Sequence, residues 1–345
     1  MRRLAVALLI ALAPCAKVAT GQEPSNLAAS TSRVSRRGPI EWREEWLLAQ
    51  PRLTLPATSP DLLPPGETRL RLDFDWGNDF GWSQDVAGEH PEDRRFLVDG
   101  EHHTLDVTLE HGLTSRLEIG GRVPVHWRGG GLLDGWIEGF HRIGFPNNAR
   151  DQFVQGRLRV EGRSEDLLPV EWTGAGGVGL GKLELDARVG LAGSARASPW
   201  RMSVIGRVAL PTGTGTFSGG GLELGAQLLA AHPLGTSFDL FLGAGAVHSS
   251  TTEYQGLVYE GNRGHGFVAV EWRPWRAWSV LAQLDAAGRQ IDDVADYPGV
   301  HSYLRLGAKV QIGERWELEA GFSENIWHQQ ATTDFGIRTG LTRRF

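Results

Sequence analysis

Residues 68–76 read Thr-Arg-Leu-Arg-Leu-Asp-Phe-Asp-Trp, so apolar and polar side chains alternate along this stretch. A period of two is the pattern of a β-strand whose two faces meet different surroundings. The apolar side chains would cover one face of this strand, and the charged side chains would cover the other. Strands that cross a membrane alternate in this way over about ten residues, with apolar side chains toward lipid.

Eleven further segments are expected to be strands on the same grounds. The twelve expected strands are residues 68–76, 102–111, 117–127, 182–191, 200–210, 222–230, 238–246, 266–272, 278–286, 303–312, 316–322 and 335–345. Short connections alternate along the chain with connections that are mostly longer, as periplasmic turns and external loops do in outer-membrane barrels. The sequence therefore predicts an all-β fold, a single antiparallel transmembrane β-barrel of about 12 strands over residues 66–345.

The composition excludes other classes of protein. The hydrophobic share is 41%, the mean hydropathy is −0.25, and the longest apolar run is Leu4–Ala13. A polytopic helical membrane protein would need several apolar runs of about 18 residues or more. The 13 Trp and 13 Phe argue against a disordered chain. Many of the Trp stand at the ends of expected strands, where aromatic girdles form at the two membrane interfaces.

The N-terminus has the pattern of a secretory signal peptide. A basic start precedes Leu4–Ala13, and small residues allow cleavage before Gln22, so residues 1–21 are expected to be removed. The remaining chain has 32 basic and 41 acidic side chains, which argues against nucleic-acid binding. Residues 22–65 are rich in Pro, Ser and Arg and are expected to be an irregular periplasmic segment. The alternative is that this segment enters the barrel and plugs it.

The C-terminal segment alternates as the other expected strands do and ends on Phe345 itself. It resembles the last strand of bacterial outer-membrane barrels, in which the insertion machinery reads a terminal Phe. The resemblance implies that the mature protein lies in the outer membrane of a Gram-negative cell. Its expected partners are outer-membrane lipid and, through this strand, the barrel-assembly machinery.

The polar faces of the expected strands predict the lining of the lumen. The candidate lining residues are Arg69, Arg71, Asp73, Asp75, Glu118, Arg122, Lys182, Glu184, Asp186, Arg188, Arg207, Arg305, Lys309, Glu317 and Glu319. The two signs of charge nearly balance, whereas a selective pore would more often show one dominant sign. We interpret these side chains mainly as structural pairs, because an isolated charge away from water is costly.

The longest expected loop, residues 128–181, contains a stretch with helical spacing of apolar residues. Trp136 lies on its apolar face, and Asp134, Glu138 and His141 lie one turn apart on a neighbouring face. These three could bind a metal or move protons. An amphipathic loop helix that folds over the mouth of the barrel is the favoured interpretation, and neither a metal nor a cofactor is expected.

The same loop carries a family resemblance. Residues 132–141, 146–147 and 150–152, together with residues 62–67 and 210–213, are similar to the hallmark segments of a bacterial family of outer-membrane β-barrel-like proteins of unknown function (DUF3187). The resemblance covers about residues 45–345. It implies the location and the fold, and it brings no activity and no catalytic residues.

The leading hypothesis for function is a non-enzymatic outer-membrane barrel, either a narrow pore for small solutes or a structural barrel with a restricted lumen. A second hypothesis is an outer-membrane enzyme that acts on lipid or lipopolysaccharide, with His126, His141 and Asp134 as candidates but no convincing serine partner. A third is an interaction barrel that binds a partner or a surface glycan through the loop at residues 129–163.

Overall fold

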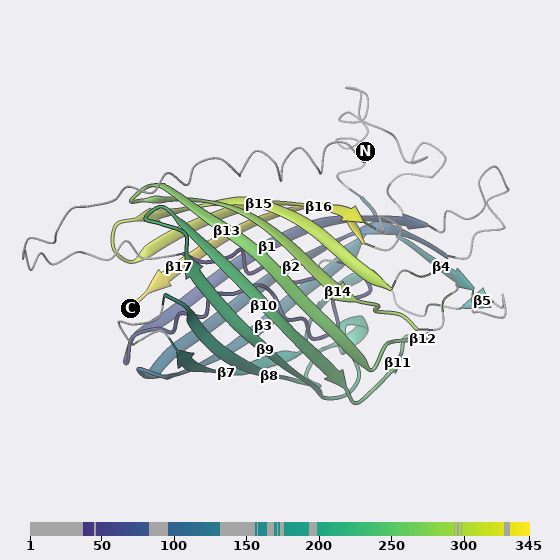
Figure 1. Cartoon of the computed structure of the whole chain (residues 1–345). Coiled ribbons are helices and arrows are strands. Elements are labelled where there is room, and N and C mark those ends of the chain that lie inside the picture. Colours follow the sequence, from purple (N-terminus) through teal and green to yellow (C-terminus); the bar gives the residue numbers. More distant parts are fainter. Residues whose placement is uncertain are drawn as a thin grey trace, which may run out of the picture. The chain divides into compact units, whose positions relative to one another are not determined.

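Twelve antiparallel strands close into a barrel in the computed structural model of the chain (Figure 1). They are β1 (Thr68–Trp82), β2 (Phe96–Thr114), β3 (Leu117–Gly129), β7 (Leu183–Ala192), β8 (Arg201–Leu210), β9 (Glu223–Pro233), β10 (Phe238–Ser249), β13 (Asn262–Trp275), β14 (Trp278–Gly288), β15 (Val300–Ile312), β16 (Trp316–Trp327) and β17 (Thr333–Arg344). The barrel closes because β1 pairs with β2 on one side and with β17 on the other. Each expected strand is present, so the predicted fold class is confirmed.

The structure describes residues 37–44, 46–82, 96–131, 156, 158–163, 169–170, 172, 176–192, 199–292, 294, 297, 299–327 and 332–345. These residues belong to one compact unit, Arg36–Phe345. Among them, no helix is both long enough and apolar enough to cross a membrane.

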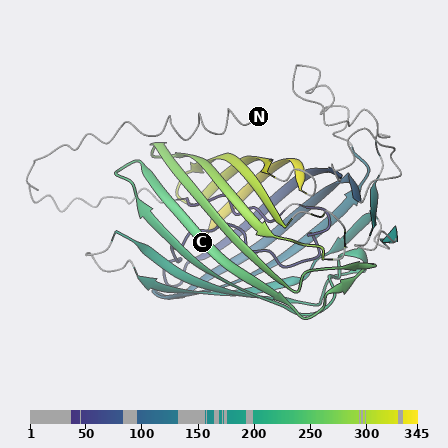
Figure 2. The same ribbon diagram turned by 45° about the vertical axis from the view of Figure 1, so that its right-hand side comes forward.

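Several short elements lie at the end of the barrel where the long connections are, here called the long-loop end (Figure 2). The strands β4 (Arg159–Arg163) and β5 (Pro169–Val170) extend the sheet from β2, and β6 (Gly177–Leu180) pairs with β3. A separate two-stranded sheet joins β11 (Glu253–Tyr254) to β12 (Leu257–Val258), and a 3₁₀ turn, η3, spans Gly215–Phe217. The opposite end is here called the short-turn end.

Several strands continue past their expected ends on the long-loop side. The ladder of β1 and β2 runs on from the pair Gly77 and His102 to the pair Trp82 and Leu97. Alternation of hydropathy stops at Trp76, but backbone pairing does not depend on it. The pattern in the sequence therefore marks only the part of each strand whose outer face is apolar.

The two faces of the wall are opposite in character. The outer face carries exposed aliphatic side chains, such as Leu109 at 53% and Leu224 at 50% exposure. The inner face carries buried charged side chains, such as Asp73 and Glu184. An apolar exterior around a polar interior is the arrangement of a barrel that lipid surrounds.

Aromatic side chains form a band on the outer face of the short-turn end. Its exposed members are Trp200, Phe238, Trp272, Trp275, Trp278, Trp316 and Phe345. Near the long-loop end, the rings of His103 and Trp127 stack with centroids 4.6 Å apart, and Phe74 stacks on Trp127 at 5.5 Å. The two groups occupy the ends at which the expected girdles lie.

Residues 37–44 and 46–63 lie inside the barrel, and Figure 2 shows their dark purple trace within the ring of strands. We call this segment the internal hairpin. The expectation of a periplasmic location is wrong for these residues, because side chains such as Trp42 and Leu53 are buried against the inner wall. The described part of the segment thus occupies the lumen, and residues 22–36 lie outside the described residues.

Candidate functional site

The first arm of the internal hairpin rises along β14 and β15 from the short-turn end. Arg37 donates through Nη2 to the carbonyl of Arg276, which lies in the turn between β13 and β14, at 2.9 Å. Further along, the backbone N–H of Ile40 donates to Oε1 of Gln283 at 3.0 Å. Near the long-loop end, Glu44 pairs with Nδ1 of His301 at 2.7 Å.

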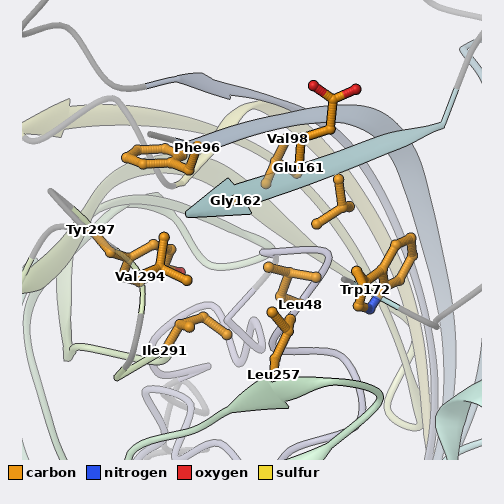
Figure 3. A pocket seen from close by; sticks show the side chains of 11 residues that line it. Leu48, Phe96, Val98, Glu161, Gly162, Trp172, Leu257, Ile291, Val294 and Tyr297 are labelled. Carbon is orange, nitrogen blue, oxygen red and sulfur yellow. The ribbon is translucent and has the colours of Figure 1, made fainter. Parts of the chain in front are cut away.

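The turn of the internal hairpin lies at the long-loop end. Its Trp46, Leu47, Leu48 and Ala49 pack in an apolar cluster with residues of β2 and of the loops. Figure 3 shows Leu48 among the residues around a small cavity there. Gln50 ends the turn, and its Nε2 donates to the carbonyl of His103 at 3.1 Å.

The second arm descends along β9, β8, β7 and β3. Arg52 pairs with Glu223, and the Leu53 N–H donates to the same carboxylate at 2.7 Å. The descent ends where the Leu63 N–H donates to Glu118 at 2.7 Å. The two arms also touch, because Oγ1 of Thr58 donates to Glu41 at 2.8 Å. The hairpin therefore runs along the lumen from the short-turn end to the long-loop end and back again.

Proline explains why the described residues of the hairpin form neither strand nor helix. Pro39, Pro51, Pro56 and Pro60 lack the N–H that a ladder requires. Buried carbonyl groups still need donors, and side chains of the wall supply them. The wall donors to hairpin carbonyls are Arg188, Arg207, Gln227, Arg263, Gln283, Arg305 and Lys309.

The structure places the candidate lining residues on the inner wall. The buried ones are Arg71, Asp73, Asp75, Glu118, Arg122, Lys182, Glu184, Arg188, Arg207, Arg305 and Lys309. The half-buried ones are Arg69, Asp186, Glu317 and Glu319. Many of them pair across strands: Asp73 and Glu319, for example, lie 2.9 Å and 2.7 Å from Arg338 of β17. Their charges balance partly within the wall and partly against the hairpin.

The charged residues of the hairpin find partners in the wall. Nη1 of Arg43 lies 2.5 Å from Oε1 of Glu184. Burial tends to raise the pKa of Glu41, but Arg71 and other arginines outweigh burial and hold that pKa well below its ordinary value. Burial likewise tends to raise the pKa of Glu44, yet its hydrogen bond and attraction to His301 lower it. Both carboxylates are thus held in the charged form.

Part of the inner wall is apolar, which the sequence analysis did not anticipate. Ile205, Phe241 and Phe267, from β8, β10 and β13, are buried in one cluster with Ala57 of the hairpin. A water-filled lumen would expose these apolar side chains to water. The signal was present in the sequence, because strands such as 238–246 carry apolar residues on both faces.

Gly225 shows how closely hairpin and wall approach. A Cβ atom at this inner-wall position of β9 would stand 2.9 Å from Leu55 of the hairpin and 3.3 Å from Leu53. Glycine leaves room there for the second arm. At this position, therefore, glycine serves the fit of the internal segment.

The remaining candidates divide into two groups. Asp134, Trp136, Glu138 and His141 lie outside the described residues. His126 is buried on the inner wall, where its Nδ1 shares a hydrogen bond of 2.9 Å with Thr104. Within the described ranges, no group of three His, Cys, Asp or Glu side chains is placed to hold a metal ion.

Sequence reasoning missed several residues of the filled lumen. They are Gln50 and Arg52 on the hairpin, and Arg128, Arg263, Gln283 and His301 on the wall. Arg128, Arg263 and His301 could have been found by extending the expected strands toward the long-loop end, and Gln283 lies within the expected strand 278–286. The hairpin residues have no periodic pattern, and the signal that remained was the unusual number of Trp and Leu in a segment rich in proline.

These features define a β-barrel of the outer-membrane type with an occupied lumen. The chain belongs to the family described as protein of unknown function (DUF3187), whose model matches residues 23–345, and the resemblance noted in the sequence is thereby confirmed. No curated protein matches the sequence.

The barrel is similar in fold to a solved outer-membrane channel. The fold resembles that of the COG4313 outer membrane channel from Pseudomonas putida F1, with a TM-score of 0.56 and 13% identity over 83% of this chain and 97% of that one. A Pseudomonas aeruginosa FadL homologue aligns with a TM-score of 0.38 and 10% identity over 84% of this chain and 92% of that one. At these identities the likeness concerns the fold alone.

Proposed function

We propose that the mature chain is an outer-membrane channel for small solutes, and that the internal hairpin closes its lumen in the conformation described here. The observation that carries the proposal is the hairpin itself, which is held in the lumen of a closed barrel largely by polar contacts. The exposed aliphatic face and the aromatic band at the short-turn end support a location in lipid. The fold of the Pseudomonas putida channel supports the same class.

The contacts of the hairpin suit a segment that can leave the lumen. Its backbone carbonyls accept from long side chains of the wall, such as Arg305 and Lys309, and not from a strand ladder. Long polar side chains can exchange these bonds for bonds to water when the hairpin moves. A lumen lined with both charges and apolar patches would then admit small solutes.

The test is conductance of the full mature chain in a planar lipid bilayer. We expect rare conductance steps from the wild type and steady conductance from a variant that lacks residues 37–63. Heat-modifiable migration in gels verifies that each barrel has folded. A folded deletion variant that never conducts would refute the channel and leave a structural barrel.

A second variant guards against loss of folding in the deletion. Glu223→Gln keeps the whole hairpin and removes the carboxylate that Arg52 and the Leu53 N–H contact. It should conduct more often than the wild type. Glu314→Gln, which changes an exposed carboxyl group in the turn between β15 and β16, is the matched control and should behave as the wild type does.

A further inference from the structure

Arg128 stands near the end of β3, at the level where the internal hairpin turns. Its side chain points into the lumen, and the residue is 4% exposed. Nε of Arg128 donates to Oε1 of Gln50 at 2.8 Å. The carboxamide of the hairpin is thus the one acceptor that this guanidinium contacts among the described residues.

Arg128 lacks a carboxylate partner among the described residues, unlike the other buried arginines there. Eleven arginines are buried in the described part of the chain, and ten of them have a carboxylate oxygen within 4.0 Å. Arg128 has none in these ranges, and its Nη1 and Nη2 are buried without an acceptor. A buried guanidinium stays charged, so leaving it unpaired is costly.

Aromatic rings surround the free side of the guanidinium. Its Cζ lies 4.6 Å from the ring centroid of Phe217 and 5.8 Å from that of Trp172. The indole Nε1 of Trp172 is also buried without an acceptor in the described structure. Two side chains thus offer unused donors at one place, between ring faces that can contact an apolar body.

Trp172 also joins this place to two hollows at the long-loop end. One is an open hollow whose lining includes Gly130, Arg159 and Gly176. The other is the small apolar cavity in Figure 3, around Leu48 and Tyr297. Trp172 lines both, so the ring that lies beside Arg128 also borders an open polar hollow and an apolar cavity at the long-loop end.

We propose that Arg128 binds the carboxylate of a small organic acid, whose apolar body lies against Phe217 and Trp172. The planar guanidinium matches a carboxylate with two parallel hydrogen bonds. One unpaired positive charge fits a monocarboxylate, and the ring faces fit an aromatic or short aliphatic body. The proposal rests on the proposed channel and names the class of solute that this channel would take.

Gln50 occupies part of the same site. Its side-chain oxygen faces Arg128 as a carboxylate oxygen would, while its Nε2 donates to the His103 carbonyl. An incoming carboxylate competes with this carboxamide for the guanidinium. Solute binding therefore weakens a contact that holds the turn of the internal hairpin.

The test is calorimetric binding of benzoate to the full mature chain in detergent. We expect saturable binding that Arg128→Gln weakens by about tenfold to a hundredfold, the loss typical of a hydrogen bond to a charged group. Benzamide, which has the same ring and no charge, should bind the wild type at least about tenfold more weakly than benzoate does. Gln50→Ala should bind benzoate more tightly than the wild type.

Arg343→Gln is the matched control. Arg343 also lies over two aromatic rings, with its Cζ 5.0 Å from Trp316 and 4.5 Å from Phe345, but at the short-turn end. Its replacement should leave benzoate binding unchanged. If Arg128→Gln does not fold, Arg128→Lys keeps the charge without the planar fork and should still weaken binding.

Three results would overturn the site. They are equal benzoate affinity in the wild type and a folded Arg128 variant, equal affinity of the wild type for benzoate and benzamide, and no binding by either the wild type or Gln50→Ala. Because binding is measured in detergent, it does not depend on whether the barrel conducts. A protein that conducts but does not bind benzoate would support the channel and refute the site. A protein that binds benzoate but never conducts would support the site and refute the channel.

Discussion

Glu223 of strand β9 holds Arg52 of the internal hairpin, with Nε of the arginine 3.1 Å from Oε1 of the carboxylate and both side chains at most 1% exposed. The same carboxylate accepts from Lys182 at 2.9 Å and from Arg263 at 3.1 Å. One acidic side chain thus contacts three basic ones at the point where the second arm begins its descent. The hairpin is fixed there by charge as well as by fit.

Replacement of Glu223 by glutamine should therefore loosen the hairpin and destabilise the barrel. Removing one partner of a buried ionic cluster costs about 3–5 kcal/mol, because the remaining charges stay buried and unpaired. The measurement is urea unfolding of the purified protein in detergent, followed by Trp fluorescence. An unfolding free energy within about 0.5 kcal/mol of wild type, the usual range for a surface substitution, would show that Glu223 does not anchor the segment.

The pair of Arg43 and Glu184 allows a test by charge exchange. Arg43→Glu and Glu184→Arg each place like charges together, so each single variant should increase open time in bilayer recordings. The double variant restores opposite charges and should close more often than either single variant. If the increase in open time of the double variant equals the sum of the increases of the two single variants, this contact does not hold the hairpin in the lumen.

Arg128 should affect stability in the opposite direction. Arg128→Met removes an unpaired buried charge, so without a solute it should raise the unfolding free energy by about 1–4 kcal/mol. Arg122→Met is the matched comparison on the same strand and inner face, and it should lower stability because Arg122 lies 3.8 Å from Glu184. The midpoint of heat-modifiable gel migration ranks the three proteins. A destabilised Arg128→Met would show that this guanidinium is balanced in the protein.

Acid should open the lumen. The pKa of Glu44 is lowered in the hairpin through its contact with His301, so its ionised form stabilises the folded arrangement above the ordinary carboxyl pKa. That contribution is lost as pH falls below the ordinary carboxyl pKa and through the lowered pKa of Glu44. Bilayer recordings from pH 7 to pH 3 should show open time rising at the acid end. The rise should shrink in Glu44→Gln, and a rise that begins at pH 6 would point to another group.

The barrel could be predicted because lipid and lumen impose opposite demands on successive residues, as in residues 68–76. The internal hairpin could not be predicted in this way. Its side chains contact the wall on every side, so the sequence of the hairpin shows no hydrophobic periodicity. Its backbone carbonyls accept hydrogen bonds from residues distant in sequence, such as Arg305. Phe241 and Phe267 were the available signal, because they are apolar inner-wall residues that pack in one cluster with Ala57 of the hairpin.

The described ends of both arms of the internal hairpin, Arg37 and Leu63, lie at the short-turn end of the barrel, and Pro64 leads almost directly into β1. The described part of the segment is therefore a doubled-back loop whose two ends lie at the same end of the ring. Such a loop can be inserted or withdrawn as a unit while all twelve strands remain paired, without a knot and without breaking the seam between β1 and β17. Closing this lumen is topologically reversible.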